Sequence, residues 1–207
     1  VLPPMPSVPL MSWAGLGIII EQMLIGIAIG LVMHIMFAVV QAAGEFIGLQ
    51  MGLAFASFFD MSSGTNIMVL SRILYMVTLL MFLAFNGHLM VLETLVMSFE
   101  TLPIGIGSLN PNAFELLARY AGTIFASGML LALPLVASLL IINLALGILN
   151  RSAPQLTVFN IGFPTSLTVG IVLLMVLMSD IGSFLQQLFS QGISFTQSLI
   201  ETMAPLN

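Results

Sequence analysis

The sequence contains no cysteine and no lysine, and these absences exclude several classes of protein. Without cysteine there is no disulfide framework and no thiolate chemistry. The basic residues are three arginines against eight acids, which leaves a net charge of −5 and no basic surface for nucleic acid. No HExxH or GxSxG motif occurs, and neither His34 nor His88 has a carboxylate three or four residues away. We therefore expect no enzymatic activity, no metal site and no cofactor.

Charged residues are also scarce. They make up only 5% of the chain, whereas soluble globular domains carry about 25%. Hydrophobic residues make up 59%, and the mean hydropathy is +1.19. A helix of about 20 apolar residues spans a bilayer, and four stretches of at least that length carry no charge: 22–44, 73–92, 120–150 and 152–179. The sequence therefore predicts an all-α integral membrane protein.

Apolar periodicity and turn signals predict three helices in the first half of the chain, over residues 14–40, 67–85 and 88–102. Asn86-Gly87 is a strong turn signal, so the second and third helices should run antiparallel. In the third helix, Glu93 and Glu100 should share one face. Four apolar residues should share another, which indicates a border with water or a polar partner: Leu89, Leu92, Val96 and Phe99.

The second half of the chain begins with a helical segment, residues 113–149, that is too long for one straight span. Asn110-Pro111 is expected to cap it. Gly122, Gly128 and Pro134 are natural break points, and we expect a kink near residues 132–134. The segment ends at a polar hairpin tip that carries Arg151, Pro154 and Gln155.

Two further helices are expected after this tip. Residues 156–178 should form a helix that Gly162 and Pro164 interrupt or kink. Residues 180–203 should form an amphipathic helix that lies on the membrane surface or against partner subunits. Its expected apolar stripe is Ile181, Phe184, Leu185, Leu188, Ile193, Leu199 and Ile200, and its polar positions are Gln186, Gln187, Gln191 and Gln197.

The stretch GEFIGLQMGLAFASFFDMSSGTN, residues 44–66, is the most informative part of the sequence. Small residues recur at every fourth position, which favours close helix–helix contact: Gly44, Gly48, Gly52 and Ala56. From Ala54 onward the helical pattern gives way to a loop. One interpretation is a tight helix contact followed by a turn. The other is a deformable pore constriction built from Met51, Gly52, Phe55, Phe58 and Phe59.

Other small or charged residues are secondary candidates. Gly26 and Gly30 form another small-residue pair that is expected to pack against a helix. Asp60 and Arg72 are close enough in sequence to form an ion pair, since an unpaired charge at membrane depth is costly. A proton-coupled secondary transporter is the alternative function, with Glu45, Asp60, Glu93 and Arg72 as its intramembrane charges.

Several strings resemble the FliR family, the R-type subunits of the flagellar and virulence type III secretion export gate. They are AAGEFIGLQMGLAFASFFD (42–60), LAFNGHLMVLETLVMSFETLPIG (83–105), LALPL (131–135), NLALGILNRSAPQLTVFNIGFP (143–164) and LTVG (167–170). Their order and unusual composition make the resemblance specific. It extends from about Glu21 to the C-terminal helix, and the family's upstream N-terminal helical region is expected to be missing from this sequence.

The resemblance implies a subunit made of two halves within a helical, hetero-oligomeric gate of kinked or broken helical hairpins. Residues 1–111 would be the half similar to the P-type subunit, with the plug at residues 51–66. Residues 112–207 would be the half similar to the Q-type subunit. The implied partners are FliP, FliQ, FlhB at the entrance and unfolded export substrates. The implied location is the flagellar basal body in the bacterial inner membrane, with the tip at Arg151 facing the cytoplasm.

Overall fold

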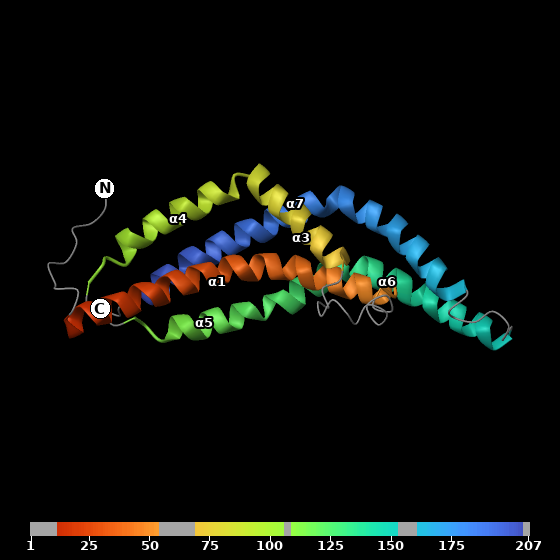
Figure 1. Ribbon diagram of the computed structural model, residues 1–207, viewed down its shortest axis with the longest axis horizontal. Helices are drawn as coiled ribbons and strands as arrows, with labels where there is room; N and C mark the ends of the chain where they lie inside the picture. The colour runs from red at the N-terminus through yellow and green to blue at the C-terminus, as the bar shows by residue number, and fades with distance from the viewer. Residues whose placement is uncertain (1–11, 54–68, 106–108, 153–160, 205–207) are drawn as a thin grey trace, which may run out of the picture. The chain divides into compact units, whose positions relative to one another are not determined.

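The computed structural model describes residues 12–53, 69–105, 109–152 and 161–204, and over these ranges it contains helices and no strand (Figure 1). The helices are α1 (Trp13–Gln50), α3 (Val69–Ala84), α4 (Gly87–Thr101), α5 (Asn112–Ala121), α6 (Thr123–Ser152) and α7 (Phe163–Met203). By length and hydropathy, α1, α7 and the α5–α6 segment are each long and apolar enough to cross a membrane. The predicted all-α membrane-type fold is confirmed.

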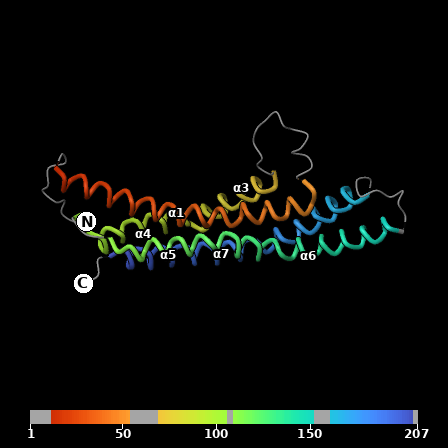
Figure 2. Tube along the Cα trace, turned by 90° about the horizontal axis from the view of Figure 1, so that it is seen from below, coloured from red at the N-terminus to blue at the C-terminus, as the bar shows by residue number. Residues whose placement is uncertain are grey.

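The chain divides into two compact units. Unit 1 consists of Val1–Met36, Phe82–Thr123 and Gln186–Asn207, and unit 2 consists of Phe37–Met81 and Ile124–Leu185. The course of α1 and α7, each of which contributes to both units, can be followed in Figure 2. Each unit thus takes segments from both of the expected halves, whose relation to P-type and Q-type subunits stays a prediction.

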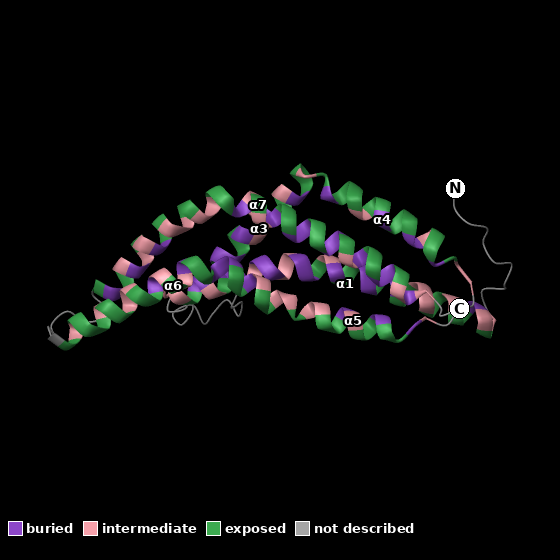
Figure 3. Cartoon of the chain, turned by 180° about the vertical axis from the view of Figure 1, so that it is seen from behind, coloured by how far each residue is buried: buried purple, intermediate pink, exposed green. Residues whose placement is uncertain are grey.

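Helix α1 joins two segments that the sequence pattern separates. It continues from the predicted helix 14–40 into the glycine-rich stretch and ends at Gln50, because nothing after Val40 interrupts the helical hydrogen bonds. Ser12 caps its first turn, since the Gly15 N–H donates to the Ser12 Oγ at 3.1 Å. Its last third carries a fully buried set of residues, and Figure 3 colours the chain by burial: Val39, Val40, Ala43 and Ile47.

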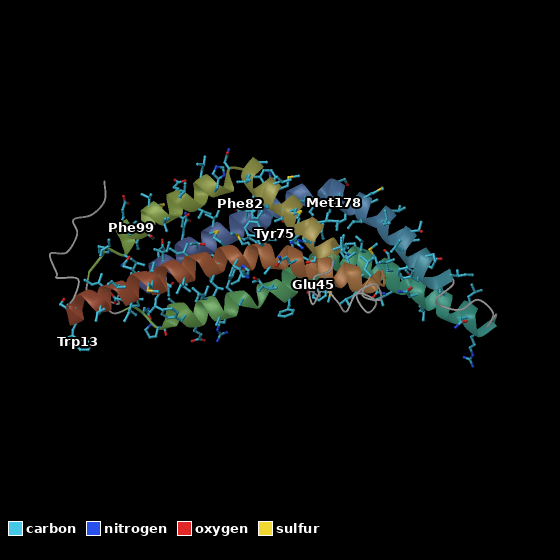
Figure 4. The ribbon with its side chains drawn as sticks, in the orientation of Figure 1. Trp13, Glu45, Tyr75, Phe82, Phe99 and Met178 are labelled. Atoms are coloured by element: carbon cyan, nitrogen blue, oxygen red, sulfur yellow. The ribbon has the colours of Figure 1, made fainter. Side chains whose placement is uncertain are left out.

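Within unit 2, this last third of α1 packs closely against α3. The Ser71 Oγ donates to the Gln41 carbonyl oxygen at 3.0 Å. The rings of Phe37 and Tyr75, the latter labelled in Figure 4, lie 5.7 Å apart. A Cβ placed on Gly44 would stand 2.6 Å from the Cα of Ser71. Gly44 therefore makes the close helix contact that its position in the small-residue stripe predicts.

The turn between α3 and α4 bends the chain by 68°, so the expected antiparallel arrangement of these helices is wrong. Asn86 adopts the left-handed conformation (φ 57°), which redirects the backbone without reversing it. Gly87 lies under the ring of Phe82, where a side chain would not fit. In turn, Phe82 meets Phe189 of α7 edge to face, with ring centroids 5.1 Å apart.

Helix α4 does not have the separated polar and apolar faces that its sequence predicts. Leu89, Glu93, Val96 and Glu100 are all exposed, and their spacing places them on one face of the helix. Its buried residues are Gly87, Thr94 and Ser98.

The break in the segment after residue 111 falls at Gly122, between α5 and α6, and α6 runs without interruption through Pro134. The break falls at the first of the three candidate positions, and the kink expected at residues 132–134 stays a prediction. Gly128 is a contact point: a Cβ there would lie 2.9 Å from the Val39 carbonyl oxygen. Before α5, the Asn112 N–H donates to the Asn110 Oδ1 at 3.0 Å, while Pro111 occupies the N-cap position without a side-chain cap.

Helix α7 is one helix of 41 residues, so the expected boundary near residue 179 is wrong. Pro164 stands in its first turn, where proline is tolerated because that N–H has no helical partner. The amphipathic pattern of residues 180–203 is confirmed. Every predicted apolar position is buried except the half-buried Phe184, and all four glutamines are exposed.

The end of α7 makes further contacts within unit 1. The ring of Phe195 stacks on Tyr120 of α5, with centroids 3.8 Å apart. Gly192 receives the side chain of Met36 of α1. The Asn110 N–H donates to the Met203 carbonyl oxygen at 3.3 Å. The burial of the apolar stripe shows that this chain itself covers it, and its expected contact with the membrane surface or partner subunits stays a prediction.

The glycines of α1 supply a matched test of helix packing. Gly44→Ala should lower the free energy of unfolding by about 1–3 kcal/mol, because the new methyl group meets the backbone of α3. Gly26→Ala should be neutral or raise it by up to about 1 kcal/mol, because nothing lies within 4 Å and alanine favours helix. Unfolding in mixed micelles with increasing SDS measures both. Equal destabilisation by the two variants would contradict the packing role of Gly44.

Candidate functional site

The helix end at the base of the proposed plug is built by the chain itself. Gly52 has φ 82°, a left-handed conformation that glycine adopts without strain. The Leu53 N–H donates to the Gly48 carbonyl oxygen at 2.9 Å, and the Gly52 N–H donates to that of Leu49 at 3.1 Å. This pair of hydrogen bonds is the Schellman motif, which closes the end of a helix. Gly52 therefore terminates α1 and does not extend its stripe of packing glycines.

Met51 is fixed beside this helix end. Its side chain is only 3% exposed. A Cβ placed on Gly170 of α7 would lie 2.6 Å from the Met51 Cγ, so the Met51 side chain packs directly against Gly170. Gly48, one turn earlier on α1, is also buried. The end of α1 and the turn after it thus meet α7 before the predicted plug. We call Gly48, Met51, Gly52 and Leu53, together with Gly170 of α7, the plug base.

The other residues predicted to form the plug, Phe55, Phe58 and Phe59, lie outside the described residues, as do Asp60, Pro154 and Gln155. Arg72 is exposed on α3, and its pairing with Asp60 stays a prediction. Arg151 is exposed in the last turn of α6.

The glycine pair on the first half of α1 behaves differently from Gly44. Gly26 and Gly30 are exposed, and neither has an atom within 4 Å of its Cβ position. Their expected packing against a helix is thus not made within the described parts of this chain and stays a prediction.

The charged side chains of the described residues are not clustered. Over the described residues, no group of three or more histidine or acidic side chains is placed to hold a metal ion. Of the carboxylates considered for a transporter, Glu45 is exposed in unit 2 (Figure 4) and Glu93 is exposed in unit 1.

The structure adds contacts that the sequence pattern does not predict. Between α6 and α7, the Ser166 Oγ donates to the Asn143 Oδ1 at 2.8 Å, and Ser166 is buried. Polar side chains of this kind hold apolar helices together. Gly170 and Gly192 were also missed, because the sequence gives no sign of which glycines lie opposite a methionine.

Comparison with known proteins assigns the chain to a family. Residues 1–192 match the model of the bacterial export proteins, family 1. The chain belongs to this family. The chain is also 50% identical to the flagellar biosynthetic protein FliR of Escherichia coli K12, over 97% of its own length and 77% of that protein's length. The resemblance to FliR found in the sequence motifs is thereby confirmed.

Other relatives carry the same name. The flagellar biosynthetic protein FliR of Pectobacterium carotovorum is 50% identical, over 91% of this chain and 72% of the relative. That of Bacillus subtilis is 32% identical, over 87% of this chain and 71% of the relative. These relatives are named for flagellar biosynthesis and not for a catalysed reaction.

The helix end at Gly52 leads to a specific expectation. Gly52→Ala should destabilise the protein by about 1–2 kcal/mol, because a side chain is strained in the left-handed conformation. Gly52→Asn should cost less, because asparagine tolerates that conformation. The unfolding free energies of the two purified variants in detergent provide the measurement. A Gly52→Ala protein as stable as the unsubstituted one would contradict the left-handed helix end.

Proposed function

We propose that this chain is the R-type subunit of the flagellar protein export gate in the bacterial inner membrane. The observation that carries the proposal is the 50% identity to FliR over nearly the whole chain. On this proposal it assembles with FliP and FliQ, contacts FlhB at the entrance and passes unfolded flagellar proteins. Residues 1–111 correspond to a P-type half and residues 112–207 to a Q-type half. The three long apolar helices support a place in the membrane.

The gating part of the proposal concerns the residues that come directly after the plug base. A closed gate must exclude ions, and an open gate must accept any side chain of an unfolded polypeptide. Apolar constrictions exclude ions by dewetting, without specific chemistry. We propose that Phe55, Phe58 and Phe59 supply this seal. Met51 and Gly52 fix the point from which the plug starts, as the burial of Met51 supports.

The plug proposal is tested by separating leakage from assembly. Phe55→Ala should let ions pass while the complex still forms, because a shorter side chain widens a dry constriction and lets water persist. Deletion of residues 54–62 should leak more, since neighbouring rings can fill part of a single gap. Ion permeation in cells is measured beside secretion of export substrates and recovery of FliP on a tagged chain.

The control for this experiment is Phe125→Ala, which shortens an exposed ring on α6, away from the plug sequence. It should remain ion-tight. A deletion that stays ion-tight while secretion fails would show that residues 54–62 are a scaffold and not a seal.

The orientation of the hairpin between α6 and α7 is a separate expectation. Arg151 is the only charged residue between Tyr120 and Ser179, and positively charged loops favour the cytoplasmic side. We propose that this tip contacts FlhB or a FliQ loop. A photo-crosslinker at Ser152 should therefore capture one of these proteins. Capture of periplasmic proteins alone would reverse the orientation.

A further inference from the structure

Helix α4 is packed with its small residues inward and its large apolar residues outward. The residues that it buries are Gly87, Thr94 and Ser98. The hydroxyl groups of Thr94 and Ser98 donate to carbonyl oxygens of their own helix at 2.8 and 2.7 Å, so neither needs a partner elsewhere. Most of α4 is coloured as exposed in Figure 3. Six of its large apolar residues are exposed: Leu89, Met90, Leu92, Leu95, Val96 and Met97.

Two carboxylates share this exposed surface. Glu93 and Glu100 follow Leu89 and Val96 by four residues each, so acidic and apolar side chains alternate along one face. We call Leu89, Leu92, Glu93, Val96 and Glu100 the α4 face. Neither carboxylate forms an ion pair within the described residues, where the only salt bridge joins Glu115 and Arg119.

The charges of unit 1 leave these two carboxylates without an internal arginine. The unit contains five carboxylates and one arginine. That arginine, Arg119, already pairs with Glu115 through two hydrogen bonds of 3.0 and 2.8 Å. A permanent cation for Glu93 and Glu100 must therefore come from outside unit 1.

Neither lipid nor water suits the α4 face. Carboxylates are costly in the hydrocarbon region of a bilayer, and two of them would stand there together. Water is equally unsuitable, because a contiguous apolar surface on a soluble face marks a site of protein association. Leu92 and Val96 are 55% and 61% exposed, so this chain leaves much of their apolar surface uncovered. A protein surface that combines apolar and basic side chains satisfies both requirements.

We propose that the α4 face binds an amphipathic helix of another export-apparatus subunit, with two basic residues seven positions apart and apolar residues between them. The inference rests on the proposed function for the existence of such a complex. Seven residues are two helical turns, or about 10.5 Å, so a helix packed along α4 presents side chains at the same interval as Glu93 and Glu100. Arginine suits the two positions best, because its guanidinium binds a carboxylate through two parallel hydrogen bonds.

The test is charge reversal in the full-length chain expressed with its apparatus. Glu93→Lys/Glu100→Lys should reduce the FliP and FliQ recovered with the tagged chain at least tenfold, because like charges then face each other in an apolar contact. Glu93→Gln/Glu100→Gln should reduce recovery about threefold and remove its dependence on salt. Glu115→Lys is the matched control on the same unit and should stay within twofold of the unsubstituted chain.

The outcomes separate this inference from the proposed function. If the unsubstituted chain recovers neither FliP nor FliQ, the proposed function fails. If it recovers both, and the double lysine variant recovers them equally well, only the α4 face is overturned. Equal thermal stability of the isolated variants in detergent would confirm that a lost complex reflects the surface and not folding.

A second measurement identifies what covers the face. Because the chain has no cysteine, Val96→Cys provides a single site for a spin label. In the assembled apparatus the label should be shielded from both dissolved oxygen and a water-soluble nickel chelate, as expected under a protein helix. Accessibility to oxygen would indicate lipid, and accessibility to nickel would indicate water. Either result would overturn the proposal.

Discussion

Close backbone approach to the last third of α1 is the constraint on which unit 2 depends. Three different helices meet this segment at positions where a side chain would not fit or would have to displace a neighbour. Gly44 of α1 lies against the backbone of α3, and Gly128 of α6 lies against the Val39 carbonyl oxygen. Gly170 of α7 receives Met51. Apolar helices gain little by mere burial in an apolar environment, so close van der Waals contact and shared hydrogen bonds determine how they associate. The glycines make that contact geometrically feasible.

The same arrangement explains why the proposed plug can begin where it does. A segment that must yield to passing polypeptides needs a fixed origin, and α1 supplies one whose side chains are packed on several sides. Val39, Val40, Ala43 and Ile47 are fully buried immediately before it. On the far side, the Ser71 Oγ holds α3 to the Gln41 carbonyl oxygen. The parts of the chain that flank the plug are therefore joined to each other independently of the plug.

Composition and local patterns were sufficient to predict the helices, but not how far each one extends or where it packs. The apolar stripe of residues 180–203 was predicted because its period follows from helical geometry alone. Gly122, Gly128 and Pro134 are all candidate break points in sequence, and only the fold shows that the helix ends at Gly122 and continues through the other two. Gly26 and Gly44 look alike in sequence, and only the fold decides that Gly44 meets another backbone. The sequence pattern places Gly52 in the packing stripe and in the candidate constriction, although its position after a periodic segment is also typical of a helix end.

The end of α1 is formed by local hydrogen bonds, and this determines where the sequence of the chain can change without disturbing the helix. The hydrogen bonds from Gly52 and Leu53 satisfy carbonyl groups at the end of the helix that lie three and five residues earlier. The stop is therefore encoded locally, and it does not depend on the length or the composition of the segment after Leu53. Insertions, deletions and substitutions in that segment can accumulate without shifting the register of α1 against its three neighbours. The segment after Leu53 can therefore change in sequence while the packing of α1 before Gly52 stays the same.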